Sequence, residues 1–382
     1  MVATSRPRVV FWNGIPSPYI QERFNAVARR GNLDFEAWFS AKSEAGRSWR
    51  VDEREWEFEH HYVPNLLSGT RGCRLNLPVR LLHRAPDLLV SLYADPSCLL
   101  GWFVARRLGA RTAFRVLRTY PSWVRRTRLK EAAKAWLFPR VDGFFVPGPD
   151  GARQVESYGG DAGRVHCVTQ SVDVQHFSAQ RQAQLKRRDE IRRSLNLSGT
   201  TFIYVGRLWR SKGLDYLIDA FATLQERLDG DASLLLVGDG VDEARYRRRC
   251  DKRGLRKVTF TGFVDRDALP KLHAAADVFV FPTLGDPYGL VVDEAMACSL
   301  PIITSSAAGE IRERVEEGVN GFIVPPANSK ALSNRMELLA RDPALRAEMG
   351  EASTRKVAGH TPERWAKDFE DGVERILAMP RV

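Results

Sequence analysis

The chain has 382 residues, a length that favours two domains, each large enough to bury its own core. Its 44% apolar and 27% charged residues are ordinary for a globular protein, and no apolar run is long enough to span a bilayer. The net charge of +11 lies almost wholly in the first half, because residues 1–170 carry 26 Lys and Arg against 16 Asp and Glu, whereas the rest carry 32 against 31.

This one-sided charge favours an anionic partner. The simpler explanation is that the charge only keeps the protein soluble. No recognition-helix, RNP-type or zinc-finger pattern accompanies the charge, so we expect no nucleic acid partner. Residues 1–8 are not followed by an apolar segment of signal-peptide type, and the expected location is therefore cytoplasmic. The cysteines are scattered without paired metal-ligand spacing, which predicts neither a disulfide framework nor a zinc site. They are Cys73, Cys98, Cys167, Cys250 and Cys298.

The first predicted strand is Arg8–Trp12, and the loop 13–19 follows it before a helix that begins near Gln21. Gly14 in this loop would allow the backbone to approach a ligand closely at the carboxyl edge of a sheet. A loop with glycine and proline more often serves only to connect a strand to a helix, and that alternative stays open.

Strands and helices continue to alternate through the first half. We expect strands at 33–39, 87–91, 112–118 and 141–147, a helix at 97–108, and a further helix capped by Asp150. Residues 122–140 interleave Arg and Lys with Trp123, Leu129 and Trp136. This composition suits peripheral attachment to an anionic membrane surface, and equally a core-packed helix with a solvated face.

The second half opens near residue 175 and repeats the alternation, with a buried strand at 202–205 and a helix at 214–228. Between them lies the segment Gly206 to Gly213, which contains Arg207 and Lys212. A glycine turn and two cations before a helix N-terminus are typical of a diphosphate-binding loop, since Arg can bridge two phosphate oxygens and Lys adds a point charge. A further strand is expected at 234–237, and a strand followed by a turn at 258–264.

The run 278–281 reads as another buried strand, and Leu290 begins a helix after the loop 283–289. Asp286 lies in this loop and Glu294 in the helix. A strand, a glycine loop and a helix N-terminus form a potential anion site. Both acids could instead be solvated residues at a helix start.

Two of these motifs resemble glycosyltransferase family 4, the retaining glycosyltransferases that use nucleotide sugars. The first is the spacing from Asp286 to Glu294 followed by Ala295-x-Ala297, and the second is GRLWRSKG at 206–213. The resemblance covers the C-terminal half. It implies that Asp286 approaches the hydroxyls of the donor sugar, that Glu294 holds the ribose, and that Arg207 and Lys212 neutralise the leaving diphosphate. The family usually has Glu where this chain has Asp286.

The resemblance also implies an α/β fold of the GT-B type, with two facing Rossmann-like domains of parallel sheets and a cleft between them. The domains expected are an acceptor-binding domain at 1–175, a nucleotide-sugar domain at 176–360, and a terminal helix at 361–382 that crosses back to the first domain. Arg118 aligns with the histidine that relatives often carry near the donor sugar. The remaining residues expected to bind the donor are Gly14, Gly206, Phe263, Val264, Gly285, Pro287, Tyr288, Gly289 and Leu290.

The function implied is transfer of a hexose-type sugar, with retention, from a UDP- or GDP-sugar to a hydroxyl of a glycan, lipid-linked or small-molecule acceptor. No cofactor and no metal are expected. The expected partners are this donor, this acceptor and an anionic membrane surface, on the inner face of the cell membrane. Two alternatives remain, a sugar-nucleotide epimerase of the same fold and a sugar-nucleotide-binding protein without turnover. Gly238-x-Gly240 lacks the rest of the dinucleotide-binding motif, so the sequence does not favour NAD binding.

Overall fold

The computed structural model describes residues 6–43, 49, 51–63, 76–92, 96–117 and 128–382. The chain forms two compact units, each with its own sheet. Unit 1 contains Met1–Ser171 and Thr361–Val382, and unit 2 contains Val172–His360. The chain first leaves unit 1 after Ser171, four residues before the domain boundary expected at 175.

Unit 1 is built on a seven-stranded sheet in the order β3-β2-β1-β4-β5-β6-β7, and all its strand pairs are parallel. Parallel strands need a crossover between them, which is why helices alternate with strands here. The strands are β1 (Arg8–Asn13), β2 (Asp34–Phe39), β3 (Glu59–Tyr62), β4 (Leu88–Leu92), β5 (Arg111–Arg115), β6 (Gly143–Val146) and β7 (Val165–Cys167).

Alternating side chains of the strands pack against two separate helical layers. Val9 and Phe11 of β1 face α1 (Pro18–Arg30) and α15 (Pro362–Ala378), whereas Val10 and Trp12 face the opposite side. The opposite layer is formed by α2 (Asn76–His83), α3 (Pro96–Arg107), α4 (Arg128–Leu137) and α5 (Pro149–Ser157). Short 3-10 turns complete the unit, at Glu53–Glu55, Phe138–Arg140 and Ala162–Arg164.

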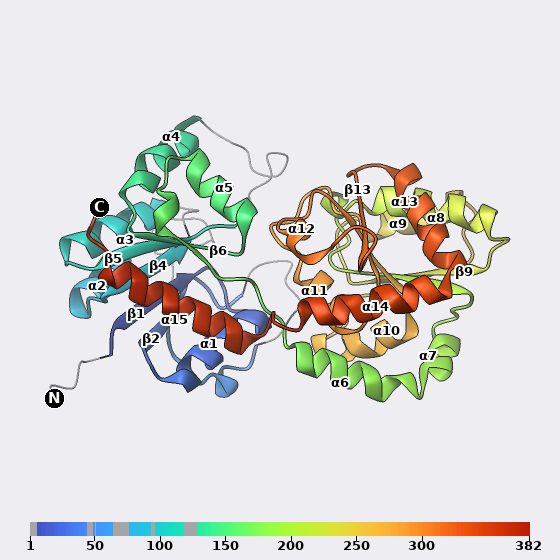
Figure 1. Cartoon of the computed structure of the whole chain (residues 1–382), viewed down its shortest axis with the longest axis horizontal. Helices are drawn as coiled ribbons and strands as arrows, with labels where there is room; N and C mark the ends of the chain where they lie inside the picture. The colour runs from blue at the N-terminus through green and yellow to red at the C-terminus, as the bar shows by residue number, and fades with distance from the viewer. Residues whose placement is uncertain (1–5, 44–48, 50, 64–75, 93–95, 118–127) are drawn as a thin grey trace. The chain divides into compact units, whose positions relative to one another are not determined.

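The last helix of the chain, α15, supplies part of the core of unit 1. Trp365 and Phe369 are buried against the first strands, and the two rings lie 6.5 Å and 5.7 Å from the ring of Phe11. Figure 1 shows α15 lying along α1 on this face of the sheet. The terminal residues are therefore an integral part of the hydrophobic core of unit 1.

Unit 2 contains a six-stranded parallel sheet in the order β10-β9-β8-β11-β12-β13. Except for the half-buried edge strand β10, its strands are almost wholly buried, as expected for parallel strands between helical layers. The strands are β8 (Thr200–Val205), β9 (Ala232–Val237), β10 (Val258–Phe260), β11 (Val278–Phe281), β12 (Ile302–Ser305) and β13 (Gly321–Val324).

The helices of unit 2 cover both faces of this sheet (Figure 1). One layer contains α8 (Leu214–Arg227), α9 (Glu243–Lys252) and α13 (Ser329–Arg341). The other contains α6 (Val174–Leu185), α7 (Arg188–Ser194), α10 (Leu269–Ala275), α11 (Leu290–Ala297) and α14 (Pro343–Val357). The short helix α12 (Ile311–Arg314) follows β12, and 3-10 turns lie at η4 (Arg210–Lys212) and Arg266–Ala268.

Three predicted boundaries are wrong. The first helix begins at Pro18 and not near Gln21, because Ser17 caps it by accepting from the N–H of Ile20 and proline suits the first turn. Strand β5 ends at Arg115, three residues before the predicted end. Asp150 does not cap α5, whose N-cap is Gly148, and lies instead in its first turn.

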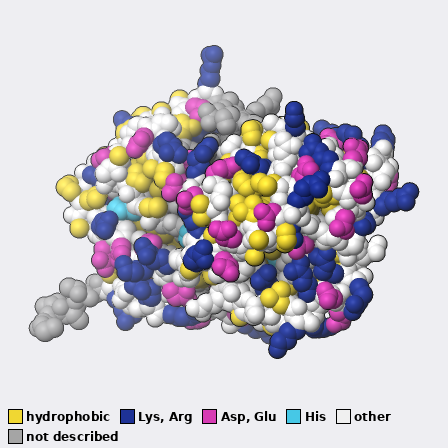
Figure 2. Space-filling view, turned by 45° about the vertical axis from the view of Figure 1, so that its right-hand side comes forward, with side chains coloured by type: hydrophobic (Ala, Val, Ile, Leu, Met, Phe, Trp, Pro, Cys, Tyr) yellow, Lys and Arg dark blue, Asp and Glu magenta, His cyan; other side chains and the backbone are white. Residues whose placement is uncertain are grey.

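Lys and Arg side chains are spread over the face of the molecule seen in Figure 2, with Asp and Glu side chains between them. Within the described residues, no helix combines the length and the apolar character that crossing a bilayer would require.

Candidate functional site

The candidate site lies where the strand order of unit 2 reverses. β8 pairs with β9 on one side and with β11 on the other, so the loops after β8 and β11 diverge at the carboxyl edge of the sheet. The N–H of Leu284 donates to the carbonyl of Ser211 (2.9 Å), which ties the two loops together. A Cβ at Gly213 would overlap the carbonyl oxygen of Pro282, and the φ of Gly213 is 72°. Glycine is therefore required for this close approach.

Lys212 and Asp286, two of the predicted site residues, contact each other across these loops. Lys212 Nζ donates a hydrogen bond to Asp286 Oδ2, and the two side chains are only 9% and 14% exposed. The ammonium group also lies 5.9 Å from the centre of the Phe281 ring. Because water screens such a pair less than a surface pair, the contact holds the ammonium group of Lys212 in place where the two loops meet.

The backbone around Asp286 fixes the orientation of its carboxylate. Asp286 Oδ1 accepts from the N–H of Tyr288 (3.0 Å), while the other oxygen accepts from Lys212. The N–H of Gly309 donates to the carbonyl of Asp286 (2.8 Å), and the N–H of Asp286 donates to the carbonyl of Ala307 (3.2 Å). The loop after β12 therefore supports the loop after β11.

Arg207 comes directly after β8 and lies at the same carboxyl edge. Its guanidinium carbon is 3.6 Å from the centre of the Trp209 ring, which fixes the plane of the group. The carbonyl of Arg207 accepts from the hydroxyl of Tyr204 (2.9 Å). Burial, together with the charge of Asp286, raises the pKa of Tyr204 well above its usual value, so the phenol remains a neutral donor.

Glu294 is buried in α11, which follows the Asp286 loop directly. Gly289 precedes this helix with a φ of 79°, and a Cβ there would lie 2.7 Å from Cε1 of Phe281. The helix therefore begins at a position that only glycine fits, which sets where Glu294 lies in unit 2.

The neighbouring acid, Asp293, forms a buried ion pair that we did not predict. Arg314 Nη1 lies 3.1 Å from Asp293 Oδ1, and His360 Nδ1 lies 3.5 Å from Asp293 Oδ2. Burial acts to raise the pKa of Asp293, but Arg314 and His360 outweigh it and hold that pKa below its usual value. Asp293 is therefore a buried carboxylate with a dedicated partner.

Arg314 also supports the loop that carries Asp286. Its guanidinium donates to the carbonyls of Gly289 (3.1 Å) and Gly309 (2.9 Å) and to the carbonyl of Tyr288. The only signal for this network in the sequence is a pair of adjacent acids in the otherwise apolar run LVVDEAMA. One of those acids faces Arg314, and nothing in the local pattern identifies that partner.

The other residues predicted to bind the donor lie around the same edge. Phe263 is exposed and Val264 half-buried in the turn after β10, and this turn is fixed where the N–H of Gly238 donates to the carbonyl of Gly262 (2.9 Å). Gly206 is packed closely as well, since a Cβ at Gly238 would overlap its carbonyl oxygen. The predicted residues of the loop after β11 and the start of α11 are Gly285, Pro287, Tyr288, Gly289 and Leu290.

Two of the predicted site residues, Arg118 and Gly14, belong to unit 1. Arg118 lies outside the described residues. Gly14 follows β1, and its carbonyl accepts from the N–H of Ser40 (2.8 Å). A Cβ at Gly14 would meet no heavy atom within 4 Å, so contacts inside the chain do not require glycine there.

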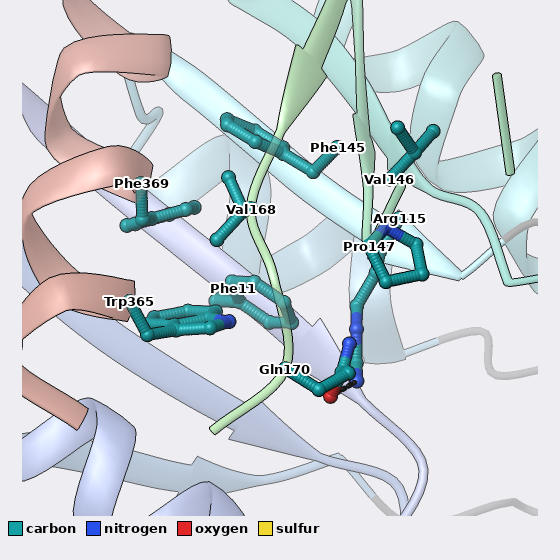
Figure 3. Close-up of a pocket in the computed structure, with 9 residues that line it drawn as sticks. All are labelled: Phe11, Arg115, Phe145, Val146, Pro147, Val168, Gln170, Trp365 and Phe369. Atoms are coloured by element: carbon teal, nitrogen blue, oxygen red, sulfur yellow. Dashed lines mark hydrogen bonds between the residues drawn. The ribbon is translucent and has the colours of Figure 1, made fainter. Parts of the chain in front are cut away.

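A small cavity in unit 1 identifies a cation that we did not predict, Arg115 at the end of β5. Figure 3 shows Arg115 reaching from β5 toward Gln170 at this cavity. Its walls are otherwise apolar, and comprise Phe11, Phe145, Val146, Pro147, Val168, Trp365 and Phe369. Burial of the guanidinium lowers the pKa of Arg115 to about 10.

Two guanidinium groups share one amide oxygen at this cavity. Arg115 Nη2 donates to Gln170 Oε1 (3.0 Å), and Arg23 Nη1 donates to the same atom (2.5 Å). Arg23 also donates to the side chain and the carbonyl of Ser171, the last residue before the chain enters unit 2. These bonds fix the end of the segment that leaves unit 1.

Within the described residues, one set of side chains has the spacing of metal ligands, formed by Glu36, Glu59 and His61. Arg8 and Arg84 already bond Glu36, each at 2.6 Å. Because guanidinium groups occupy the carboxylate, the set fits an ion-pair network at the edge of the unit 1 sheet better than a metal site.

The structure thus brings Arg207, Lys212, Asp286 and the Glu294 helix together at one edge of unit 2. Residues 187–356 match the family model described as Glycosyl transferases group 1. The chain is 31% identical over 220 residues to alpha-D-kanosaminyltransferase of Streptomyces kanamyceticus, covering 57% of this chain and 56% of that protein. It is 28% identical to D-inositol 3-phosphate glycosyltransferase of Corynebacterium urealyticum, covering 59% and 54%. The chain therefore spans about half the length of these relatives.

Two solved structures resemble this chain over nearly its whole length. HepE of Anabaena, solved in complex with UDP, has a TM-score of 0.78 at 18% identity, covering 96% of this chain and all of that one. Sucrose-phosphate synthase of Thermosynechococcus elongatus has a TM-score of 0.76 at 20% identity, covering 98% of this chain and all of that one. These likenesses confirm the predicted α/β fold of the GT-B type, with two Rossmann-like domains.

Proposed function

Because residues 187–356 match the family model described as Glycosyl transferases group 1, we propose that this chain is a glycosyltransferase. It moves a hexose-type sugar, with retention of anomeric configuration, from a UDP- or GDP-sugar to a hydroxyl of a glycan, lipid-linked or small-molecule acceptor. The observation that carries the proposal is the contact between Lys212 and Asp286. It joins a cationic loop suited to a diphosphate to an acidic loop suited to a sugar.

A uridine donor has further support from neighbouring structures. HepE of Anabaena was solved with UDP and with UDP-glucose. We therefore place UDP-sugars first in any panel of donors and GDP-sugars second.

In the proposed reaction, the bond between the anomeric carbon and the diphosphate oxygen breaks, and negative charge grows on that oxygen. Arg207 and Lys212 stabilise this charge, because both cations are already in place before the bond breaks. Asp286 binds hydroxyls of the sugar and Glu294 those of the ribose. The acceptor hydroxyl enters on the face that the diphosphate leaves, and a phosphate oxygen accepts its proton.

The proposal includes no metal ion, because Arg207 and Lys212 supply the positive charge that a divalent cation supplies in other phosphate sites. Turnover in the presence of excess EDTA tests this part of the proposal. Loss of turnover in EDTA and its return with added Mg²⁺ would contradict it.

The experiment that tests the function is a donor and acceptor panel analysed by chromatography and mass spectrometry. UDP-glucose, UDP-galactose, UDP-N-acetylglucosamine and GDP-mannose are incubated with purified protein, with and without sugar acceptors. A glycosyltransferase releases UDP or GDP in step with a new glycoside. Conversion of the donor into an isomer without any acceptor would favour the epimerase, and tight donor binding without any product would favour a binding protein.

A further inference from the structure

Helices α2, α3 and α4 form one continuous layer on unit 1. All three cover the face of the sheet opposite α1 and α15, and α2 lies beside α3. The rings of Trp102 in α3 and Trp136 in α4 are 5.7 Å apart, and Arg106 Nη1 donates to the carbonyl of Arg140 (2.9 Å). The outer surfaces of the three helices therefore face solvent together.

Among the described residues, this outer surface carries large apolar side chains that are partly or largely exposed. Two from each helix are between 36% and 80% exposed. Within each helix the two are three, four or seven residues apart, so they lie on one side of that helix. They are Val79 and Leu82 in α2, Leu99 and Phe103 in α3, and Leu129 and Trp136 in α4. Elsewhere in the described residues, exposed large apolar side chains are scattered over separate elements.

The same surface is strongly basic. The only acid in the three helices is Glu131, and both Lys134 (3.1 Å) and the hydroxyl of Tyr158 (2.6 Å) bond it. Besides Lys134, which bonds this acid, the three helices carry five cations, Arg80, Arg106, Arg107, Arg128 and Lys130.

Cations and exposed aromatic rings are paired on this surface. The guanidinium of Arg107 lies 4.8 Å from the centre of the Phe103 ring, and that of Arg140 lies 4.7 Å from the Trp136 ring. An aromatic ring with a guanidinium on it suits the boundary between lipid headgroups and acyl chains, where the ring enters the boundary and the cation meets phosphate.

We propose that the outer face of α2, α3 and α4, here called the docking face, binds an anionic lipid surface. Leu82, Phe103 and Trp136 enter the headgroup boundary, and the surrounding cations contact lipid phosphates. Two copies of the docking face would bring like charges together, which disfavours a dimer through this surface. A bilayer with anionic headgroups complements the charge and covers apolar side chains that stand on three helices at once.

The proposal is independent of the proposed glycosyl transfer, and it extends the membrane prediction made from the sequence. Of the predicted basic stretch 122–140, residues 122–127 lie outside the described part, and residues 128–140 form α4 and the turn after it. The structure adds α2 and α3, neither of which the sequence analysis had assigned to a membrane surface.

Vesicle sedimentation with the full chain tests the docking face. One set of vesicles contains phosphatidylcholine alone, and the other contains about one third phosphatidylglycerol. We expect at least about tenfold more protein on the anionic vesicles, and less as salt is raised, because salt screens the attraction. The double variant F103S/W136S should lose most of this binding. The matched control is L338S on α13 of unit 2, where Leu338 is 40% exposed, and it should bind as the wild type does.

A second variant, R107Q/R140Q, keeps both rings and removes the cations over them. It should bind anionic and neutral vesicles more nearly equally. If a thermal melt shows that F103S/W136S does not fold, R107Q/R140Q still tests whether the docking face binds anionic lipid. Equal binding of the wild type to both vesicle types, or binding to neither, would overturn the proposal. A lipid-free dimer that F103S/W136S dissociates, measured by light scattering, would make the surface a contact between copies and would also overturn it.

Discussion

Lys212 and Asp286 are 74 residues apart in the chain, yet the ammonium of one donates to the carboxylate of the other at the carboxyl edge of the unit 2 sheet. Both side chains are largely buried, so each holds the other in place. A cation that binds a leaving diphosphate must be positioned before the reaction begins, and Asp286 is the group that positions Lys212.

We therefore expect Lys212→Ala to lower kcat/KM for glycosyl transfer by about a hundredfold or more, because it removes one preorganised cation from the leaving group. The measurement is the initial rate of UDP release with the best donor and acceptor. Lys330→Ala, at an exposed position on α13, is the matched control and should stay within about twofold of the wild type. Near-normal turnover of Lys212→Ala would remove Lys212 from the site.

Glu294→Ala should abolish stabilisation of the protein by its donor. A ligand that binds only the folded state stabilises it by about 2.7 kcal/mol at one hundred times its Kd, which for a domain of this size raises Tm by about 5 °C or more. The measurement is a thermal shift with UDP-glucose, and glucose alone is the control. An equal shift in the wild type and in Glu294→Ala would contradict the assigned contact with the ribose.

Arg314→Met should destabilise unit 2 by about 3–5 kcal/mol, because it leaves the buried carboxylate of Asp293 without its guanidinium. Urea unfolding measures this cost. The exposed pair of Arg335 and Glu317 (3.0 Å) offers the matched control, and Arg335→Met should cost no more than about 1 kcal/mol. Adding Asp293→Asn to Arg314→Met should recover part of the loss, and strict additivity of the two changes would show that the residues are not coupled.

The stability of unit 2 should depend on pH through His273. This histidine is fully buried in α10, its ring nitrogens have no hydrogen-bond partner among the described residues, and burial lowers its pKa to about 3. The unfolded chain takes up a proton below about pH 6.5, and the folded chain does so only near pH 3, so the stabilising effect is complete above pH 6.5 and falls as pH drops toward 3.

At pH 5, His273 therefore lowers the free energy of unfolding by about 2 kcal/mol relative to pH 8. His273→Leu should remove that part of the pH dependence, and urea unfolding at several pH values measures it. His83→Leu, at an exposed histidine, is the matched control and should keep the wild-type dependence. An unchanged slope in His273→Leu would place the titrating group elsewhere.

Gly143→Ala should lower the stability of unit 1 by about 1–3 kcal/mol, because the added methyl group would overlap Cγ1 and Cδ1 of Ile376 in α15. Combining it with Ile376→Ala should cost less than the sum of the two single changes, since the methyl group then enters the space that the isoleucine leaves. Gly359→Ala, where a Cβ meets nothing within 4 Å, is the control. Equal losses at Gly143 and Gly359 would show that α15 does not pack on β6 as described.

The sequence was most informative where a site is contiguous. GRLWRSKG lies within eight residues, and Asp286 and Glu294 are separated by a single loop and helix turn, so local patterns could identify them. The contact between Lys212 and Asp286, and the bonds from Arg314 to the loop before α11, depend on long-range packing that local periodicity does not encode. The start of α1 is a different case, because Ser17 and Pro18 are a local helix-start signal that can be read directly from the sequence.

The packing of α15 in unit 1 also affects the order in which the protein assembles on the ribosome. Unit 2 is continuous in the chain and can collapse as soon as its last strand and helices have been translated. Unit 1 lacks Trp365, Phe369 and Ile376 until α15 has been translated after unit 2, so its N-terminal part carries an uncovered apolar surface while unit 2 is being translated. The N-terminal half should therefore be the last to reach its native state, and the part of the molecule that most depends on chaperones.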